Sequence, residues 1–87
     1  MSCYNIMSVL TSKRIENVSE MQRIFTESGC IIRTRLGIHD AGADFCSDEG
    51  LIILNLIGSE EEILNLENGL NKIPGVKAKN TRLSSDD

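Results

Sequence analysis

Residues Gly50–Glu62 read GLIILNLIGSEEE, and this stretch decides the fold class because it joins two different kinds of element. Its first eight residues place apolar side chains on both faces of an extended strand, apart from Asn55, as in a central strand covered on both sides. Ser59 then stands where a helix N-cap is expected, and Glu62 completes a capping box. Three glutamates in the first turn suit the positive end of the helix dipole. The stretch therefore predicts a buried strand over 50–57 that leads directly into a helix.

Downstream of this stretch, apolar residues recur at helical spacing as far as Ile73, and Pro74 ends the helix. Gly69 lies inside the helix and weakens it by about 1 kcal/mol relative to alanine. Residues 76–83 alternate as an edge strand does, and we expect the tail 84–87 to fray. In this strand we expect Val76 and Ala78 to face inward and Lys77 and Lys79 to face outward.

Upstream, residues 4–11 form a second run that is apolar on both faces and suits a central strand. Residues 17–28 have helical spacing, with Asn17 as the N-cap. Residues 31–39 alternate as a strand with one buried face does, and residues 40–49 are small and acidic, which predicts a loop. In the alternating strand we expect one set to face the core and the arginines to face solvent: Ile32, Thr34, Leu36 and Ile38 inward, and Arg33 and Arg35 outward.

The order of these elements is β-α-β-β-α-β, which predicts the α+β class and a ferredoxin-like βαββαβ sandwich. In this fold two helices cover one face of an antiparallel sheet whose strand order is 4-1-3-2. The first and third strands, the two that are apolar on both faces, are the central strands of that order. At 87 residues the chain is expected to form a single domain over 1–87, with its core over about 4–83.

One face of such a sheet is left without helices, and this predicts a self-associating protein. The central strands should leave an aliphatic stripe there, from Met7, Val9, Ile53 and Ile57 or from their alternates. A domain this small buries only part of its apolar surface, which favours association with another copy. We therefore expect a homodimer or homotetramer that assembles through the open sheet face or the sheet edges. The alternative is a monomer whose weakly apolar sheet face is in contact with water.

Composition narrows the function classes further. The net charge of −4 disfavours direct binding of nucleic acid, because phosphates repel an acidic chain. No apolar run is long enough to span a membrane and no signal-peptide pattern precedes the first strand, so we expect a cytoplasmic protein. Three cysteines at irregular spacing indicate free thiols in a reducing compartment rather than disulfides. No catalytic grouping and no phosphate-binding glycine loop is recognisable, so we expect no catalytic residues and no enzyme.

Three segments together resemble a known family. Arg35–Ile38 (RLGI), the strand that begins at Gly50, and the helix end Ile73–Val76 (IPGV) resemble the ACT-like proteins called iron-only hydrogenase system regulators, over about residues 5–83. That family is likened to the C-terminal, nickel-binding domain of nickel-responsive repressors. The resemblance implies a non-catalytic, oligomeric, ligand-binding module with a regulatory role, which could act on transcription through a partner protein. The turn at 11–15 lacks the glycine or proline found in amino-acid-binding ACT domains.

Four residues are candidates for binding a small ligand of unknown identity. Thr11 and Ser12 lie in the turn after the first strand, and Arg33 and Arg35 lie on an edge strand, where they could hold an anion at a subunit boundary. The simpler interpretation of the arginines is that they are solvated edge charges. A purely structural interaction protein, with no small ligand, is a further hypothesis.

Two other residues suggest a metal-responsive module as an alternative. His39 and Cys46 flank the loop 40–49, and imidazole and thiolate are suitable ligands for nickel, zinc or copper. Two copies of the chain could join such half-sites into a four-ligand set. The simpler interpretation is a solvated loop that binds no cofactor. The cofactor prediction is therefore none, with a divalent transition metal such as nickel as the alternative.

Overall fold

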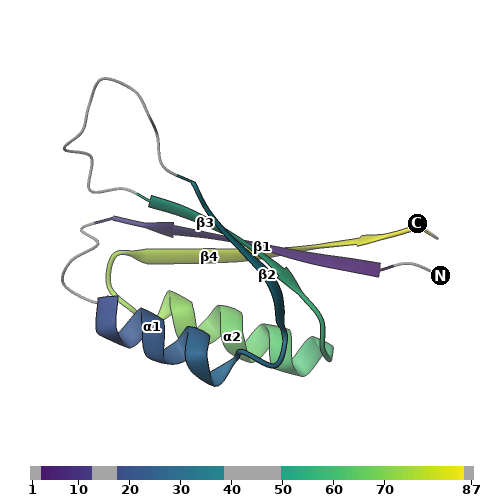
Figure 1. Cartoon of the computed structure of the whole chain (residues 1–87), viewed down its shortest axis with the longest axis horizontal. Helices are drawn as coiled ribbons and strands as arrows, with labels where there is room; N and C mark the ends of the chain where they lie inside the picture. Colours follow the sequence, from purple (N-terminus) through teal and green to yellow (C-terminus); the bar gives the residue numbers. More distant parts are fainter. Residues whose placement is uncertain (1–2, 13–17, 39–49, 86–87) are drawn as a thin grey trace.

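The computed structural model describes residues 3–12, 18–38 and 50–85, and in these residues the elements follow the predicted order (Figure 1). The strands are β1 (Cys3–Thr11), β2 (Ile32–Ile38), β3 (Gly50–Leu56) and β4 (Val76–Ser84), and the helices are α1 (Val18–Glu27) and α2 (Glu60–Asn71). All pairs are antiparallel, and the sheet order β2-β3-β1-β4 is the predicted order seen from the other edge. The fold is ferredoxin-like, as predicted.

The element boundaries differ from the predicted ones by small amounts. Strand β4 includes Ser84, which pairs with Cys3, so the strand extends one residue into the segment that was expected to fray. Strand β2 begins at Ile32 rather than at the preceding residue. The predicted N-cap Asn17 and the predicted loop 40–49 lie outside the described residues.

The start of α2 confirms the capping box. The Ser59 hydroxyl accepts a hydrogen bond from the Glu62 N–H at 3.1 Å, and a Glu62 carboxylate oxygen accepts one from the Ser59 N–H at 2.9 Å. Two backbone N–H groups at the helix start, which have no partner within the helix, are therefore satisfied by side chains. The helix then buries Ile63, Leu66 and Leu70 along one stripe, which fixes the face that it turns to the sheet.

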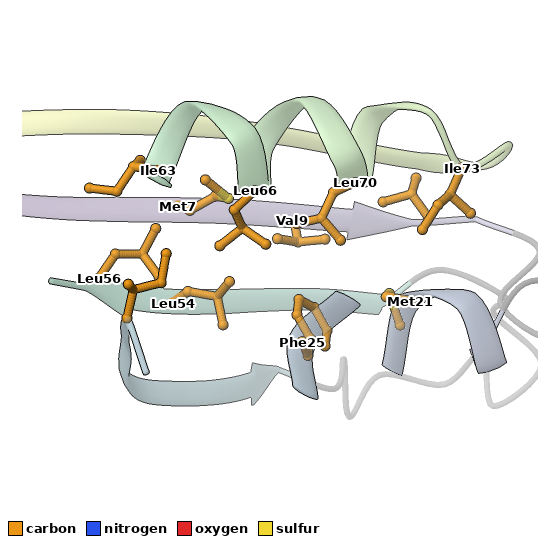
Figure 2. Packing of buried hydrophobic residues seen from close by; sticks show 12 residues of the cluster. Met7, Val9, Met21, Phe25, Leu54, Leu56, Ile63, Leu66, Leu70 and Ile73 are labelled. Atoms are coloured by element: carbon orange, nitrogen blue, oxygen red, sulfur yellow. The ribbon is translucent and has the colours of Figure 1, made fainter. Parts of the chain in front are cut away.

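The core lies between the sheet and the two helices, which cover the same face (Figure 1). Met7 and Val9 of β1 and Leu54 of β3 are completely buried under the helices (Figure 2). The buried apolar residues of the described chain are Met7, Val9, Met21, Phe25, Ile31, Leu54, Leu56, Ile63, Leu66, Leu70, Ile73 and Val76. In the described residues the core is therefore built from aliphatic side chains and methionines around the Phe25 ring.

The pairing register decides which residues of the central strands form the stripe on the uncovered face. Met7 pairs with Leu54, so Met7 and its neighbour Val9 face the helices rather than the open side. Their alternates on β1, Ile6 and Leu10, take that place instead. Of the other residues named for the stripe, Ile53 lies on the open side as expected, and Ile57, which directly follows β3, is exposed.

Strand β2 is an edge strand as predicted, but its predicted inward and outward faces are wrong over most of its length. The β2–β3 ladder has a bulge between Ile32 and Thr34, where the register shifts. A bulge inserts one extra residue, so every later side chain changes face. Leu36 therefore pairs with Ile53 on the open side and is 56% exposed, whereas Arg35 lies on the helix side.

Candidate functional site

The uncovered side of the sheet, called the open face below, collects most of the exposed apolar side chains of the described chain. It comprises Tyr4, Ile6, Ser8 and Leu10 of β1, Leu51, Ile53 and Asn55 of β3, Thr34 and Leu36 of β2, and Lys77, Lys79, Thr81 and Leu83 of β4. Six large apolar side chains are strongly exposed among the described residues, and four of them are on this face: Tyr4, Leu10, Leu36 and Leu83. A fifth, Ile57, directly follows β3 with the same parity as Ile53. This concentration on one face marks an association surface.

The centre and the margin of the open face differ in charge. Ile53 lies at the centre, flanked by Ser8 on β1 and Leu36 on β2. The cations are confined to one outer strand, where Lys77 and Lys79 pair with Leu10 and Ser8. Long lysine side chains can lie along apolar neighbours while their ammonium groups stay in water. The open face thus has an uncharged, largely apolar centre and cations along one margin, an arrangement suited to a protein interface.

Thr11 ends β1 and Ser12 follows it. Their hydrogen bonds join this end of β1 to the start of β3 and to the turn before β4. The Thr11 hydroxyl donates to the Gly50 carbonyl at 3.3 Å, and Thr11 is almost fully buried. The Ser12 N–H donates to the Gly75 carbonyl at 2.7 Å, and the Ser12 hydroxyl donates to the same oxygen at 3.3 Å. Both side chains therefore already have structural partners, and Ser12 is the one of the two that is exposed.

Arg33 and Arg35 do not share one environment. Arg33 lies at the bulge and is exposed. Arg35 instead crosses to α1, where its guanidinium carbon is 4.6 Å from the centre of the Phe25 ring and its Nη1 donates to Gln22 Oε1 at 3.4 Å. A cation over an aromatic face is favourable by about 0.5–1 kcal/mol at exposed sites. Arg35 therefore helps to hold α1 against the sheet edge.

The predicted ligand residues are not brought together within one chain. Strand β3 separates Arg35 from Thr11, and along the sheet Arg35 is level with Leu54 and Met7, four residues before Thr11. At strand spacings of about 4.8 Å and a rise of about 3.3 Å per residue, the two backbones are more than about 15 Å apart. Within one chain, Arg35 and Thr11 therefore do not form one compact site.

The predicted metal residues His39 and Cys46 lie outside the described residues, so the structure does not test them. Over residues 3–12, 18–38 and 50–85, no three His, Cys, Asp or Glu side chains are grouped so that they could hold a metal ion. Cys3 and Cys30 are both exposed free thiols. None of the helices in the described part of the chain is long and apolar enough to cross a membrane.

An open groove of about 630 Å³ runs between the two helices, on the side away from the open face. Arg23 projects from α1 at its edge and donates to Glu27 Oε2 at 2.7 Å and to Glu20 Oε2 at 3.3 Å. The hydrogen bond from Arg23 holds the pKa of Glu20 below its ordinary value. Arg23 is thus held by carboxylates of its own helix rather than presented to a ligand.

A polar cluster between α2 and the outer part of the sheet was not predicted from the sequence. Asn80 of β4 donates through its backbone N–H to Glu67 Oε2 at 2.7 Å and through its side chain to Asn5 Oδ1 at 3.1 Å. The Asn80 Oδ1 atom is buried and accepts no hydrogen bond. Asparagines at helix-facing positions of the central strand β1 and the outer strand β4 were the available signal, and they stand where aliphatic residues would be expected.

Comparison with known proteins gives the fold a broader setting. No protein-family model matches the sequence, and no curated protein matches it significantly. An uncharacterized protein of Thermotoga maritima has a similar structure, with a TM-score of 0.81 at 19% identity, over 95% of this chain and 100% of that one.

Two further solved structures are similar over almost the whole chain. The ACT domain of a GTP pyrophosphokinase from Chlorobium tepidum has a TM-score of 0.62 at 16% identity, over 98% of this chain and 91% of that one. A nitrogen regulatory PII-like protein from Thiomonas intermedia, solved with ADP, AMP and bicarbonate, has a TM-score of 0.56 at 10% identity, over 95% of this chain and 94% of that one. At these identities the likeness shows the fold alone: the chain has the ferredoxin-like βαββαβ fold that it shares with this ACT domain and this PII-like protein.

Proposed function

We propose that this chain is a small non-catalytic regulatory module that binds a small molecule and works as a homo-oligomer assembled through its open face. The observation that carries the proposal is the uncovered apolar centre of the sheet around Ile53. A fold whose core lies entirely between the sheet and the helices does not need aliphatic side chains on the other side. Their presence there is explained by a second layer that covers them.

The size of the open face suits a second copy of the chain. Four strands about 4.8 Å apart, each of seven to nine residues at about 3.3 Å, present roughly 500 Å². Two copies stacked face to face would bury about 1,000 Å², which is near the lower limit for a specific interface. We therefore expect a dimer with affinity in the micromolar range rather than a permanent one.

The chemistry of the open face also favours a second copy over a different partner. A two-fold interface needs a patch that is complementary to itself, and an uncharged, largely apolar centre meets that condition. Lys77 and Lys79 lie at one margin, so two copies related by a two-fold axis can keep these lysines at the rim, where they remain in water. A strongly acidic partner would instead call for cations at the centre of the face.

The regulatory part of the proposal is supported by the structural likeness to a nitrogen regulatory PII-like protein and to the ACT domain of a GTP pyrophosphokinase. It agrees with the resemblance of the sequence to the iron-only hydrogenase system regulators. On this proposal the protein is a cytoplasmic, single-domain sensor with no catalytic residue and no direct contact with nucleic acid. Its ligand lies at a subunit boundary near Ser12 or the arginines of β2.

Sedimentation equilibrium of the wild-type protein and of Ile53→Glu tests the assembly. The glutamate would place a charge at the centre of the interface, so we expect association to weaken by about a hundredfold. Leu64→Glu is the matched control, because Leu64 is 52% exposed on α2, away from the open face. The control should associate like the wild type. A wild-type protein that stays monomeric far above micromolar concentration would remove the assembly proposal.

Native mass spectrometry of protein purified without chelator tests ligand binding. A stoichiometric additional mass on the oligomer would identify what the module senses. A bare oligomer that co-purifies with a partner protein would favour the purely structural hypothesis instead.

The metal-responsive alternative stays a prediction and has its own test. Calorimetric titration with nickel or zinc under reducing conditions should give a stoichiometric binding isotherm that is lost in His39→Ala and in Cys46→Ser. No heat of binding at neutral pH would remove this alternative.

A further inference from the structure

Strand β4 forms an edge of the sheet, yet four of the backbone groups that point away from β1 already have hydrogen-bond partners within the chain. Along an antiparallel strand every second residue bonds to the neighbouring strand, and the others point away from it. On β4 the outward set includes Val76, Ala78 and Asn80. An unprotected edge would leave their N–H and C=O groups available for pairing with another strand.

Side chains of α2 occupy the middle of this edge. Asn71 makes two hydrogen bonds with the backbone of Ala78: its Oδ1 accepts from the Ala78 N–H at 2.7 Å, and its Nδ2 donates to the Ala78 carbonyl at 2.9 Å. The asparagine amide thus occupies the same groups that another strand would use. One turn earlier in the helix, Glu67 accepts from the Asn80 N–H at 2.7 Å. We call Asn71 and Glu67 the β4 clasp.

The backbone closes the beginning of the same edge. The Val76 N–H donates to the Ile73 carbonyl at 3.1 Å, where the chain leaves α2. Three consecutive outward N–H groups of β4 are therefore bonded within the same chain. The next outward residue is Arg82, whose charge also disfavours strand addition.

The other edge of the sheet is guarded differently. Strand β2 carries the bulge between Ile32 and Thr34 and an exposed arginine, Arg33, at the bulge. Bulges and charged side chains are the usual means by which edge strands avoid pairing. In the described residues both sheet edges are therefore protected against pairing, whereas the open face is a large apolar surface that nothing covers.

We infer that the β4 clasp blocks strand addition at β4 and so directs self-association to the open face. This inference rests on the proposed function for the direction of assembly, while the blocking of β4 stands on the hydrogen bonds alone. Without the clasp, β4 would offer a row of unpaired backbone groups to any second copy. Sheets of two chains could then join edge to edge, which competes with stacking face to face.

Hydrogen–deuterium exchange of backbone amides tests the clasp directly. In the wild type the Ala78 amide should be protected although it points away from β1. In Asn71→Ala it should exchange about tenfold faster, while the Asn80 amide keeps its protection through Glu67. Asn68→Ala is the matched control, since Asn68 is an exposed asparagine of the same helix. In that variant both amides should exchange as in the wild type.

An internal control and a second pair of variants distinguish local loss of protection from global unfolding. The amide of Leu54, in the central strand, should exchange at the same rate in all variants if the fold is intact. Glu67→Gln keeps an oxygen acceptor for the Asn80 N–H, whereas Glu67→Ala removes it. The Asn80 amide should therefore stay protected in the first and lose protection in the second.

The state of assembly then shows whether these hydrogen bonds block strand addition at β4 or only hold α2 against β4. The double variant Asn71→Ala/Glu67→Ala should form species larger than the wild-type oligomer in sedimentation velocity, because β4 becomes available for pairing. A double variant that assembles like the wild type would overturn the inference, as would an Ala78 amide that exchanges equally fast with and without Asn71. A monomeric wild type would remove the proposed function, but faster exchange at Ala78 and larger species of the double variant would still support the blocking of β4.

Discussion

Gly75 marks the point where the chain turns from α2 into β4, and replacing it with alanine should destabilise the fold strongly. Its φ is +82°, in the left-handed region that residues with a side chain rarely adopt. An alanine Cβ at this position would lie 2.6 Å from the carbonyl oxygen of Ser12. That oxygen belongs to the backbone of the β1 end, so it cannot move aside as a flexible side chain could.

The magnitude follows from three contributions. The left-handed conformation costs about 1–2 kcal/mol for alanine. Relief of the clash would displace the backbone of Ser12 and weaken the 2.7 Å hydrogen bond from its N–H to the Gly75 carbonyl, which is a loss of about 1 kcal/mol. The lower entropy of the unfolded alanine chain returns about 0.4–1 kcal/mol. The free energy of unfolding should therefore fall by about 2 kcal/mol, which corresponds to a melting temperature lower by about 8–16 °C.

Urea denaturation followed by circular dichroism, at one fixed protein concentration, measures this difference. Gly69→Ala is the control with the opposite expected sign. Gly69 lies inside α2, where an alanine Cβ would meet the Ile24 side chain at an ordinary 3.8 Å. Alanine should raise the free energy of unfolding there by about 0.5–1 kcal/mol. The reasoning is refuted if Gly75→Ala is as stable as the wild type, or if both substitutions change stability in the same direction.

Three other substitutions probe the helices and the core. Ser59→Ala removes the capping box and should lower the free energy of unfolding by about 1 kcal/mol in the same urea titration, with unchanged stability as the contrary result. Leu54→Ala should lower it by about 3 kcal/mol, because Leu54 is fully buried; a loss under about 1 kcal/mol would mean that the core repacks. Glu20 has a lowered pKa, so its bond with Arg23 stabilises the fold fully above the ordinary value of 4.5 and loses that effect as pH falls through the lowered value. Melting curves of the wild type and Glu20→Gln should therefore differ at about pH 7 and converge as pH falls below the lowered pKa of Glu20, and a difference independent of pH would contradict this assignment.

Patterns within single segments were sufficient to predict the elements and their order. The capping box at Ser59 and Glu62 and the apolar stripe of α2 depend on residues three or four apart, so local spacing is enough to identify them. The apolar character of residues 4–11 and 50–57 on both faces predicted the two central strands correctly.

Register and side-chain direction could not be predicted in the same way. Both faces of β1 are apolar, so its pattern could not tell whether Met7 and Val9 or Ile6 and Leu10 face the helices. Pairing of Met7 with Leu54 under α2 resolves this ambiguity. In β2 the alternation was regular in the sequence, and the bulge that reverses it arises only when the strand pairs with β3.

In the candidate site, too, the sequence indicated the chemistry of the residues but not their arrangement in space. Thr11, Ser12, Arg33 and Arg35 were chosen for their side-chain chemistry, which the sequence shows, but their distances from one another depend on strand pairing. The β4 clasp was missed for the same reason. Asn71 and Ala78 are seven residues apart on different elements, and nothing in either segment indicates that an asparagine amide will meet a backbone edge.

The sequence by itself therefore determined the class of fold, the two central strands and the start of α2, because each depends on the periodicity of residues close together in the chain. Only the tertiary structure decided which aliphatic residues form the open face, that Arg35 packs on Phe25, and that α2 closes the β4 edge. These features depend on pairing between segments far apart in the chain. One residue of register moves every side chain to the opposite face, so a local pattern cannot specify them.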